Sequence, residues 1–319
     1  MNKSFFRTIL GDIPSSEMGL TYAHEHIVID DGYVTAAHPE FLLNDVKKIT
    51  EELQRFYNVG GRTVVDTMPS NCGRNPILSA KVSQSSKVNI IVPTGIHLEI
   101  YYPKNHWRYK YSEDQLTELF VADIEVGIDR FDYGAPIVDR TMHKAGLIKL
   151  ATGDDVFTAH QEKIFRAVVN AHLETGAPIL THSNFGNQAL EQAKLFDKLG
   201  ADMNHVVLSH VDRYKDLNYQ RKVLDTGVRI EYDSVFRWKK GDKNWTLFFL
   251  ENLLEQYPDQ ITLGMDMAKN AYWKSYGGSP GLTYLIDEIP DFLKSKNLEK
   301  YYQNLFFENP KLLYSFSDI

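Results

Sequence analysis

The sequence of 319 residues predicts a (β/α)8 barrel, and three observations support this fold class. About eight short apolar runs alternate with segments of helical spacing along the chain, an order typical of repeated βα units. Most of these runs are apolar throughout, as expected of parallel strands that are buried on both faces. The Gly-x-Gly-x-x-Gly turn that would favour the alternative, an open doubly wound sheet, does not occur. Eight βα units close most simply into one barrel domain over residues 1–319.

The expected strands are short apolar segments, several of which end in a polar residue. An N-terminal arm or hairpin over residues 1–18 comes first, because an apolar stretch runs directly into a turn at Gly11-Asp12. Strands are then expected at residues 21–28, 62–66, 88–95, 145–151, 178–182, 205–210, 228–232 and 261–266.

Helical segments separate these strands and carry recognisable start and stop signals. Apolar residues recur at helical spacing over residues 42–58, and Gly60-Gly61 ends that segment. The segment 112–131 opens with Ser112 and Gln115, which have the spacing of a capping box. Further helices are expected at 76–86, 160–174, 187–199, 217–225 and 245–256, with a largely helical tail at 290–319. The aromatic and basic residues 101–111 form either a loop over a site or a plain surface loop.

Charge and composition exclude several classes of partner. The net charge of −7 argues against nucleic acid and against an anionic membrane surface. Cys72 is the only cysteine, so no disulfide can form within the chain and a reducing compartment is expected. No apolar run approaches the roughly 18 residues of a membrane helix, and the apolar stretch at the start is too short for a secretory signal. We expect a cytoplasmic protein.

Histidines and one carboxylate recur where strands end, and together they indicate a metal site. His24 and His26 lie two residues apart on the first strand, so their side chains project from the same face. His182, His210 and Asp266 end three later strands, and strand ends meet at the catalytic rim of a barrel. Taken singly, His24 and His26 are equally well explained as a chance pair on a surface strand, and His182 or His210 as a buried core histidine. As a set, they are ligands that Zn²⁺ or a similar metal prefers, and their number implies two ions.

Lys149 interrupts the apolar strand at 145–151, where burial of an unpaired ammonium is costly. One interpretation is that the lysine snorkels or pairs with a carboxylate. The other is that its amine reacts with CO2 to form a carbamate, whose two oxygens can bridge two metals. The second interpretation makes the lysine a ligand.

These motifs resemble the phosphotriesterase family of the amidohydrolase superfamily. The resemblance covers essentially the whole chain and rests, in order, on the N-terminal hairpin, His24-Glu-His26, Ala145-Gly-Leu-Ile-Lys149-Leu-Ala-Thr152, Leu180-Thr-His182, Leu208-Ser-His210 followed by Asp212, Gly264-Met-Asp266 and Phe307-Glu-Asn-Pro310. It implies that His24, His26 and Asp266 hold one metal. It also implies that His182 and His210 hold the other, and that carboxylated Lys149 and a hydroxide bridge the two. Zn²⁺ is expected first, with Mn²⁺ or Co²⁺ as alternatives, and the family suggests a homodimer.

The resemblance also implies a hydrolytic mechanism, in which the bridging hydroxide attacks an ester carbonyl and Asp266 takes its proton. Members of the family hydrolyse organophosphate triesters, acyl-homoserine lactones and sugar lactones. Three basic loops on the catalytic rim favour an anionic substrate, because cations and tyrosine hydroxyls suit a phosphate group. The candidate phosphate-binding residues are Arg213, Lys215, Arg237, Lys239, Lys240, Lys269 and Tyr272. We therefore expect a phosphorylated aldono-1,4-lactone, as in the similar branch that hydrolyses phosphorylated sugar lactones.

The third strand is followed by candidate pocket residues that depart from part of the family. His97, Glu99 and Tyr101 occupy this region, where lactonases of the family often carry tyrosine, and this departure argues against a long-chain acyl lactonase. The alternative activities are those of a phosphotriesterase (an organophosphate hydrolase) or an acyl-homoserine lactonase. The non-enzymatic alternative is a catalytically inactive barrel that binds a ligand. Retention of all six ligand positions favours an enzyme.

Overall fold

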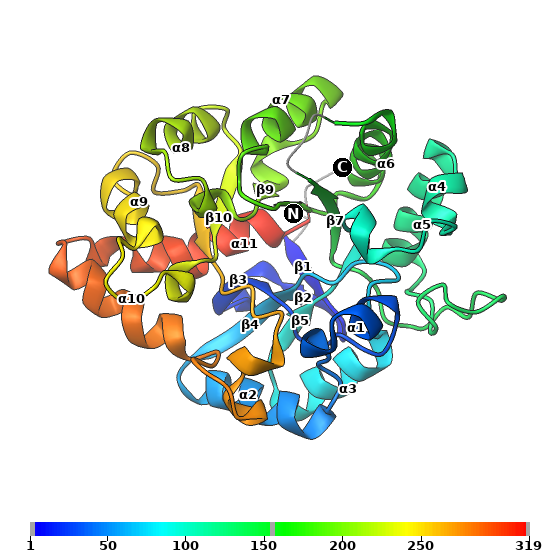
Figure 1. Ribbon diagram of the computed structural model, residues 1–319, viewed down its shortest axis with the longest axis horizontal. Helices are drawn as coiled ribbons and strands as arrows, with labels where there is room; N and C mark the ends of the chain where they lie inside the picture. The colour runs from blue at the N-terminus through cyan, green and yellow to red at the C-terminus, as the bar shows by residue number, and fades with distance from the viewer. Residues whose placement is uncertain (1–3, 154–156, 317–319) are drawn as a thin grey trace.

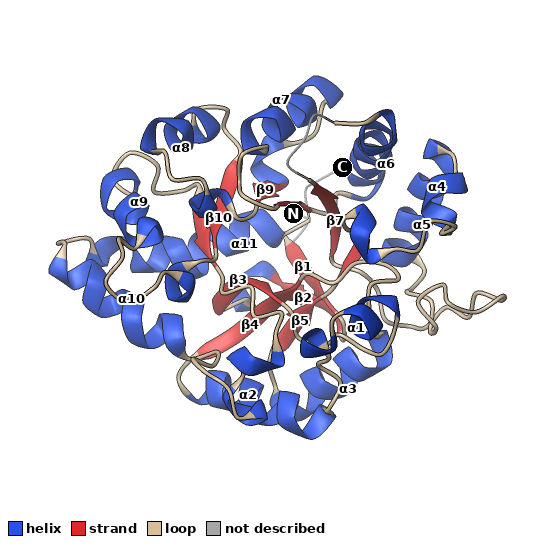
Figure 2. Ribbon diagram, in the orientation of Figure 1, coloured by secondary structure: helices blue, strands red, loops and turns tan. Residues whose placement is uncertain are grey.

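A ring of parallel strands surrounded by helices forms the body of the protein, which confirms the predicted (β/α)8 barrel (Figure 1). Figure 2 shows the strands at the centre and the helices outside them. The computed structural model describes residues 4–153 and 157–316. Residues 1–3 of the expected arm and 317–319 of the expected tail therefore lie outside the described residues.

The ring is built from two parallel sheets, β3-β4-β5 and β6-β7-β8-β9-β10-β11. The strands are β3 (Leu20–Glu25), β4 (Gly61–Asp66), β5 (Asn89–Ile91), β6 (Pro93–Gly95), β7 (Leu147–Thr152), β8 (Ile179–Ser183), β9 (Val206–Leu208), β10 (Arg229–Tyr232) and β11 (Ile261–Leu263). The short strands β5 and β6 are two halves of the segment expected at 88–95, one pairing with β4 and the other with β7. On the other side, the N–H groups of Met265 and Asp266 donate to the carbonyl oxygen of His24 at 3.2 and 2.9 Å, which joins β11 to β3.

Helices join the strands, and most of them lie outside the ring (Figure 2). They are α1 (Tyr33–Ala37), α2 (Val46–Asn58), α3 (Pro76–Ser86), α4 (Trp107–Lys110), α5 (Glu113–Glu125), α6 (Ala159–Thr175), α7 (Ala189–Leu199), α8 (Leu217–Leu224), α9 (Trp245–Leu253), α10 (Tyr284–Ser295) and α11 (Asn309–Tyr314). The capping box of Ser112 and Gln115 is present, but the helix expected to reach residue 131 ends at Glu125. That part of the prediction is wrong because Gly127 adopts a φ of 148°, which a helix does not allow. In the part of the chain that is described, no helix has the length and apolar character needed to span a membrane.

An apolar layer fills the inside of the barrel below the polar strand ends. Its buried members are Phe6, Met18, Ala23, Val65, Ile91, Leu147, Leu180, Val207, Leu313 and Tyr314. Leu147 and Leu180 lie two residues before Lys149 and His182, so each strand carries an apolar residue and then a polar one on the same inward face. The antiparallel hairpin of β1 (Phe5–Thr8) and β2 (Gly11–Pro14) closes the barrel from the end opposite the polar residues, together with α11. The polar residues at the strand ends are therefore supported by a layer of closely packed apolar side chains.

Candidate metal centre

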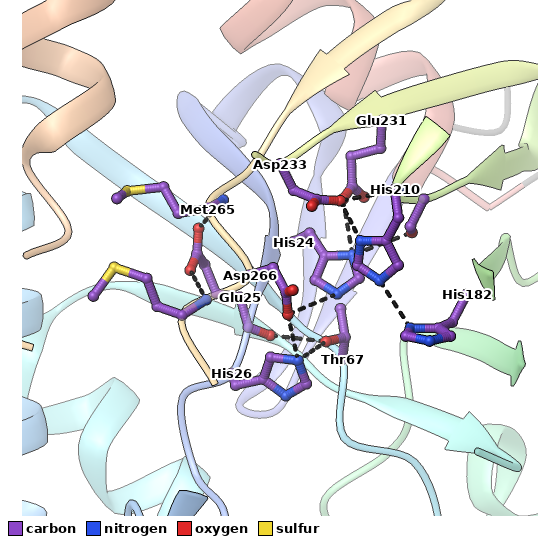
Figure 3. A network of polar contacts seen from close by, with 12 residues as sticks. His24, Glu25, His26, Thr67, His182, His210, Glu231, Asp233, Met265 and Asp266 are labelled. Atoms are coloured by element: carbon purple, nitrogen blue, oxygen red, sulfur yellow. Dashed lines mark hydrogen bonds and ion pairs between the residues drawn. The ribbon is translucent and has the colours of Figure 1, made fainter. Parts of the chain in front are cut away.

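His24, His26 and Asp266 meet where the ends of β3 and β11 adjoin (Figure 3). One ligand atom from each of the three lies within 4.8 Å of the others. His26 Nε2 is 3.0 Å from Asp266 Oδ1, and His24 Nε2 is 3.8 Å from the same oxygen. The Nε2 atom of His24 is buried and finds no hydrogen-bond partner within residues 4–153 and 157–316. Two imidazole nitrogens and a carboxylate oxygen in this arrangement suit a divalent cation.

His182 and His210 face each other beside this group, and their outer hydrogen bonds define which nitrogen of each ring carries the proton. Nδ1 of His210 is 2.5 Å from Asp233 Oδ2 and donates to that carboxylate. Nε2 of His182 is 2.9 Å from Asn184 Oδ1 and donates to that oxygen. Burial lowers the pKa of His182 to about 3 and the pKa of His210 well below its ordinary value, so both rings are neutral.

The two remaining nitrogens of this pair therefore both carry lone pairs. His210 Nε2 lies 2.8 Å from His182 Nδ1. Two lone pairs that face each other at this distance repel unless a proton or a cation lies between them. Fixing of the ligand tautomer by an outer carboxylate is also typical of metal-binding histidines. The donor set therefore fits a second cation on this side of the site.

Lys149 lies on β7, the strand paired with β8 that carries His182, and its side chain is fully buried. In the described part of the chain its Nζ atom makes no hydrogen bond. Burial lowers the pKa of Lys149 to about 8, although Asp266, Glu231 and Asp66 act in the opposite direction. A buried amine with a lowered pKa has an increased neutral fraction, and the neutral amine is the form that reacts with CO2.

Two arginines hold the second oxygen of Asp266. Arg213 and Arg237 donate to Oδ2 at 2.6 and 2.9 Å, while Oδ1 faces His26. Burial by itself raises the pKa of Asp266, but Arg237, the hydrogen bond with His26 and Arg213 together hold this pKa well below its ordinary value. The carboxylate is therefore ionised, with Oδ1 directed toward the histidines.

The backbone is left-handed at two of these residues. His210 has a φ of 65° and Asp266 a φ of 50°, a region that residues other than glycine rarely adopt. This is why the strands expected at 205–210 and 261–266 end earlier, at Leu208 and Leu263. Hydrogen bonds from the N–H groups of His210 to Asp233 and of Asp266 to the His24 carbonyl maintain these conformations. Backbone strain of this kind is concentrated at functional sites.

A cavity of about 210 Å³ opens beside the histidines. Its walls are formed by His26, Ile29, Val34, Phe41, Met68, His97, Tyr101, His182, Asn184, Arg213, Arg237, Asp266, Ala268, Lys269 and Tyr272. The set includes His97 and Tyr101 from the expected substrate pocket. It also includes Arg213, Arg237, Lys269 and Tyr272 from the expected phosphate-binding set. The ammonium of Lys269 is also 3.9 Å from Glu40 Oε1 and is partly exposed to solvent.

The other residues of the expected pocket lie outside this cavity lining. Lys215 is exposed, with its ammonium 5.1 Å from the ring centre of Trp238. Lys239 and Lys240 are exposed in the loop after β10, and Glu99 is exposed at the start of the short helical turn Glu99–Tyr101. The loops direct these side chains to solvent, where a charged group keeps its hydration.

Several buried polar residues of the site were not found from the sequence. Asp233 contacts His210 and Arg213, and Ser209 Oγ lies 3.1 Å from His24 Nδ1 with hydrogen-bond geometry. Glu231 Oε1 is nearer to the same nitrogen, at 2.8 Å, but the angle between the two groups does not allow a hydrogen bond. Ser209 is therefore the hydrogen-bond partner of His24 Nδ1. Burial raises the pKa of Glu231 well above its ordinary value. The available signal for Asp233 was its place directly after the strand expected at 228–232, since Asp266 was identified by a similar place at the end of its expected strand.

Comparisons with known proteins give a consistent result. The model of the phosphotriesterase family matches residues 4–314. The chain is 30% identical to a phospho-furanose lactonase of Mycoplasmopsis agalactiae over 98% of this chain and 92% of that protein. It is 31% identical to a phospho-furanose lactonase of Mycoplasmopsis synoviae, over 100% of this chain and 94% of that one. Among solved structures, an amidohydrolase from Mycoplasma synoviae superposes with a TM-score of 0.95 at 30% identity, covering 100% of this chain and 94% of that chain.

Proposed function

Because the chain belongs to the phosphotriesterase family, we propose that it is a metal-dependent hydrolase that opens a phosphorylated sugar lactone to the corresponding sugar acid. The observation that carries this proposal is the combination of a buried ligand cluster with a cavity that has a basic wall, formed by Arg213, Arg237 and Lys269. The names of the two lactonase relatives support the same substrate class.

The ligand set that we propose is His24, His26 and Asp266 for one cation, and His182 and His210 for the other, with Lys149 carboxylated between them. Two observations support this assignment: the facing lone pairs of His182 and His210, and the Lys149 amine, which has no hydrogen-bond partner among the described residues. Nitrogen and carboxylate ligands favour Zn²⁺, with Mn²⁺ or Co²⁺ as alternatives. Cations held there supply hydroxide at neutral pH and polarise the ester carbonyl.

The side chains around the ligands perform the remaining steps. Asp266 Oδ1 takes the proton of the attacking hydroxide, while Arg213 and Arg237 hold Oδ2 and fix the carboxylate. As the acyl C–O bond breaks, the same proton passes to the ring oxygen, which becomes the hydroxyl group of the open sugar acid. The acid is therefore formed as a carboxylate, and the one proton released per turnover at neutral pH comes from the water that supplies the next hydroxide.

The phosphate group of the substrate is assigned to the basic wall. Lys269 and Tyr272 offer an ammonium and a phenol to the cavity, and Arg237 contacts Asp266 and lies 5.3 Å from the ring centre of Tyr272. Phosphate sites in barrels commonly involve the loops after the last two strands, which carry these residues.

The test is an assay of the metal-loaded protein on matched five-carbon lactones with and without a terminal phosphate, with acid release followed at constant pH. The proposal expects strong preference for the phosphorylated lactone. Comparable rates on both would remove the phosphate assignment. Hydrolysis of a neutral organophosphate triester alone would favour the second candidate, a phosphotriesterase, which the apolar side of the cavity at Ile29, Val34, Phe41 and Met68 would suit.

A further inference from the structure

His97 follows β6 and lines the cavity beside the ligand cluster. In the order of strands around the ring, β6 and its continuation β5 are separated from β10 by β7, β8 and β9 on one side and by β4, β3 and β11 on the other. His97 therefore faces the cavity from a wall across the barrel from the loops that carry Arg237, Lys269 and Tyr272. Its ring centre is 5.0 Å from that of His182, so it stands close to where the scissile bond would lie.

Hydrogen bonding determines which nitrogen of His97 carries the proton. The N–H of Leu98 donates to His97 Nδ1 at 2.7 Å, so Nδ1 holds a lone pair. The proton of the neutral ring must then be on Nε2. Because Nδ1 accepts this hydrogen bond, the ring carries a single proton and is neutral. Within the described residues, no group accepts a hydrogen bond from Nε2.

The loop after β6 holds the backbone of His97 from both sides. Tyr102 Oη accepts from the N–H of His97 at 2.8 Å and donates to the carbonyl oxygen of Ser70 at 3.0 Å. Arg108 donates to the carbonyl oxygen of His97 at 3.0 Å, and its guanidinium lies 4.7 Å from the ring centre of Tyr102. Tyr102 and Arg108 are both buried, so this frame is built into the protein interior. A buried frame that fixes one donor toward a cavity is typical of a binding group, because the position of the donor is set before the ligand arrives.

We infer that His97 is a specificity-determining residue whose Nε2–H donates a hydrogen bond to a ring hydroxyl of the sugar lactone. The inference rests on the proposed function and deepens it. With the carbonyl of a furanose lactone at the ligand cluster and its phosphate at the loops after β10 and β11, the C2 and C3 hydroxyls are the substrate groups that remain for the wall of β6. The enzyme would then select lactones that carry a hydroxyl group at one of these carbons.

The test compares the phosphorylated lactone with its 2-deoxy and 3-deoxy analogues in the metal-loaded wild type and in two variants. His97→Gln keeps a donor N–H near the position of Nε2, whereas the shorter side chain of His97→Asn places its amide near the position of Nδ1 and leaves no donor near Nε2. The wild type should show a kcat/KM roughly tenfold higher on the full lactone than on one of the deoxy analogues, as expected for a neutral hydrogen bond. His97→Gln should retain most of this ratio, and His97→Asn should reduce it to about twofold or less.

The two variants remove the same ring, so a loss of packing lowers their rates on all three lactones alike and leaves the ratio unchanged. An unchanged ratio in His97→Asn, while lactone hydrolysis persists, overturns the inference and leaves the proposed function standing. If the wild type hydrolyses no lactone, with or without phosphate, the proposed function fails and this inference fails with it. A ¹⁵N NMR spectrum that shows the proton of His97 on Nδ1 also overturns the inference, whatever the substrate.

Discussion

The ligand cluster at the strand ends and the lysines in the loops beyond it occupy the same end of the barrel, but they are held in different ways. His24, His210 and Asp266 are buried, and each has a polar partner on a neighbouring strand or loop. Lys239 and Lys240 are exposed, and Lys215 makes only an exposed contact with Trp238. Strand register fixes the first group, whereas the course of each loop decides the second. We therefore expect the residues at the strand ends to carry out the reaction, which requires fixed geometry. The few loop residues that line the cavity are expected to recognise the substrate.

Asp266→Asn should produce the largest effect, because it acts at the centre of the fixed group. The amide keeps the shape of the carboxylate but cannot take a proton, so we expect kcat to fall by roughly 10³-fold. The fold should be retained, as judged by an unchanged circular dichroism spectrum. Unchanged turnover would contradict the role of Asp266 as proton acceptor and would remove the distinction between the strand ends and the loops.

Lys149→Met separates the effect of the buried lysine on stability from its role in metal binding. Methionine removes a buried amine that has no hydrogen-bond partner among the described residues, so the metal-free protein should melt at a higher temperature than the metal-free wild type. The same variant should bind less metal than the wild type and should lose most of its activity. Calorimetry of the chelated proteins and elemental analysis of the loaded proteins measure the two effects. A lower melting temperature together with full metal content would contradict both assignments.

The same contrast explains how far the sequence predicts the structure. His182 and Lys149 could be placed because side chains alternate along a strand and the ends of parallel strands meet at one rim. Asp233 also follows a strand directly, but its role depends on a contact with His210 at the end of the neighbouring strand, which its position in the sequence does not reveal. The positions of loop lysines such as Lys240 could not be predicted, because a loop backbone is set by tertiary packing rather than by a periodic pattern.

Lys269→Ala and Lys240→Ala form a matched pair that tests which loop cations reach the substrate. Lys269 lines the cavity, whereas Lys240 is exposed outside its lining. We expect Lys269→Ala to raise KM for the phosphorylated lactone by roughly tenfold, the effect of losing one charge-assisted contact. KM for the unphosphorylated lactone should change little.

Lys240→Ala removes the same charge from the same end of the barrel and serves as the control for long-range electrostatics. It should leave KM within about twofold of the wild-type value at physiological ionic strength, because exposed charges are screened. Equal effects of the two substitutions would mean that the phosphate group is attracted by the summed charge of the rim rather than bound by Lys269.

His160→Gln should have the smallest effect and tests whether the loop that frames His97 responds to pH. His160 Nε2 accepts from Arg108 at 3.2 Å, and the groups that face it are Arg108, Lys163 and Tyr109. Partial burial, followed by the charges of Arg108 and Lys163, lowers the pKa of His160 to about 4 from the ordinary 6.5. The unfolded chain therefore binds a proton that the folded chain rejects between these values, and stability falls as the pH drops from 6.5 to 4. Because His160 is partly exposed, we expect the free energy of unfolding to fall by only about 1 kcal/mol after allowing for solvent screening.

Glutamine can accept from Arg108 without titrating, so the His160→Gln variant should show a shallower fall in melting temperature over this range. Identical pH profiles for the two proteins would show that His160 does not couple the frame to pH, and that this loop, like the strand ends, is held by contacts that do not titrate.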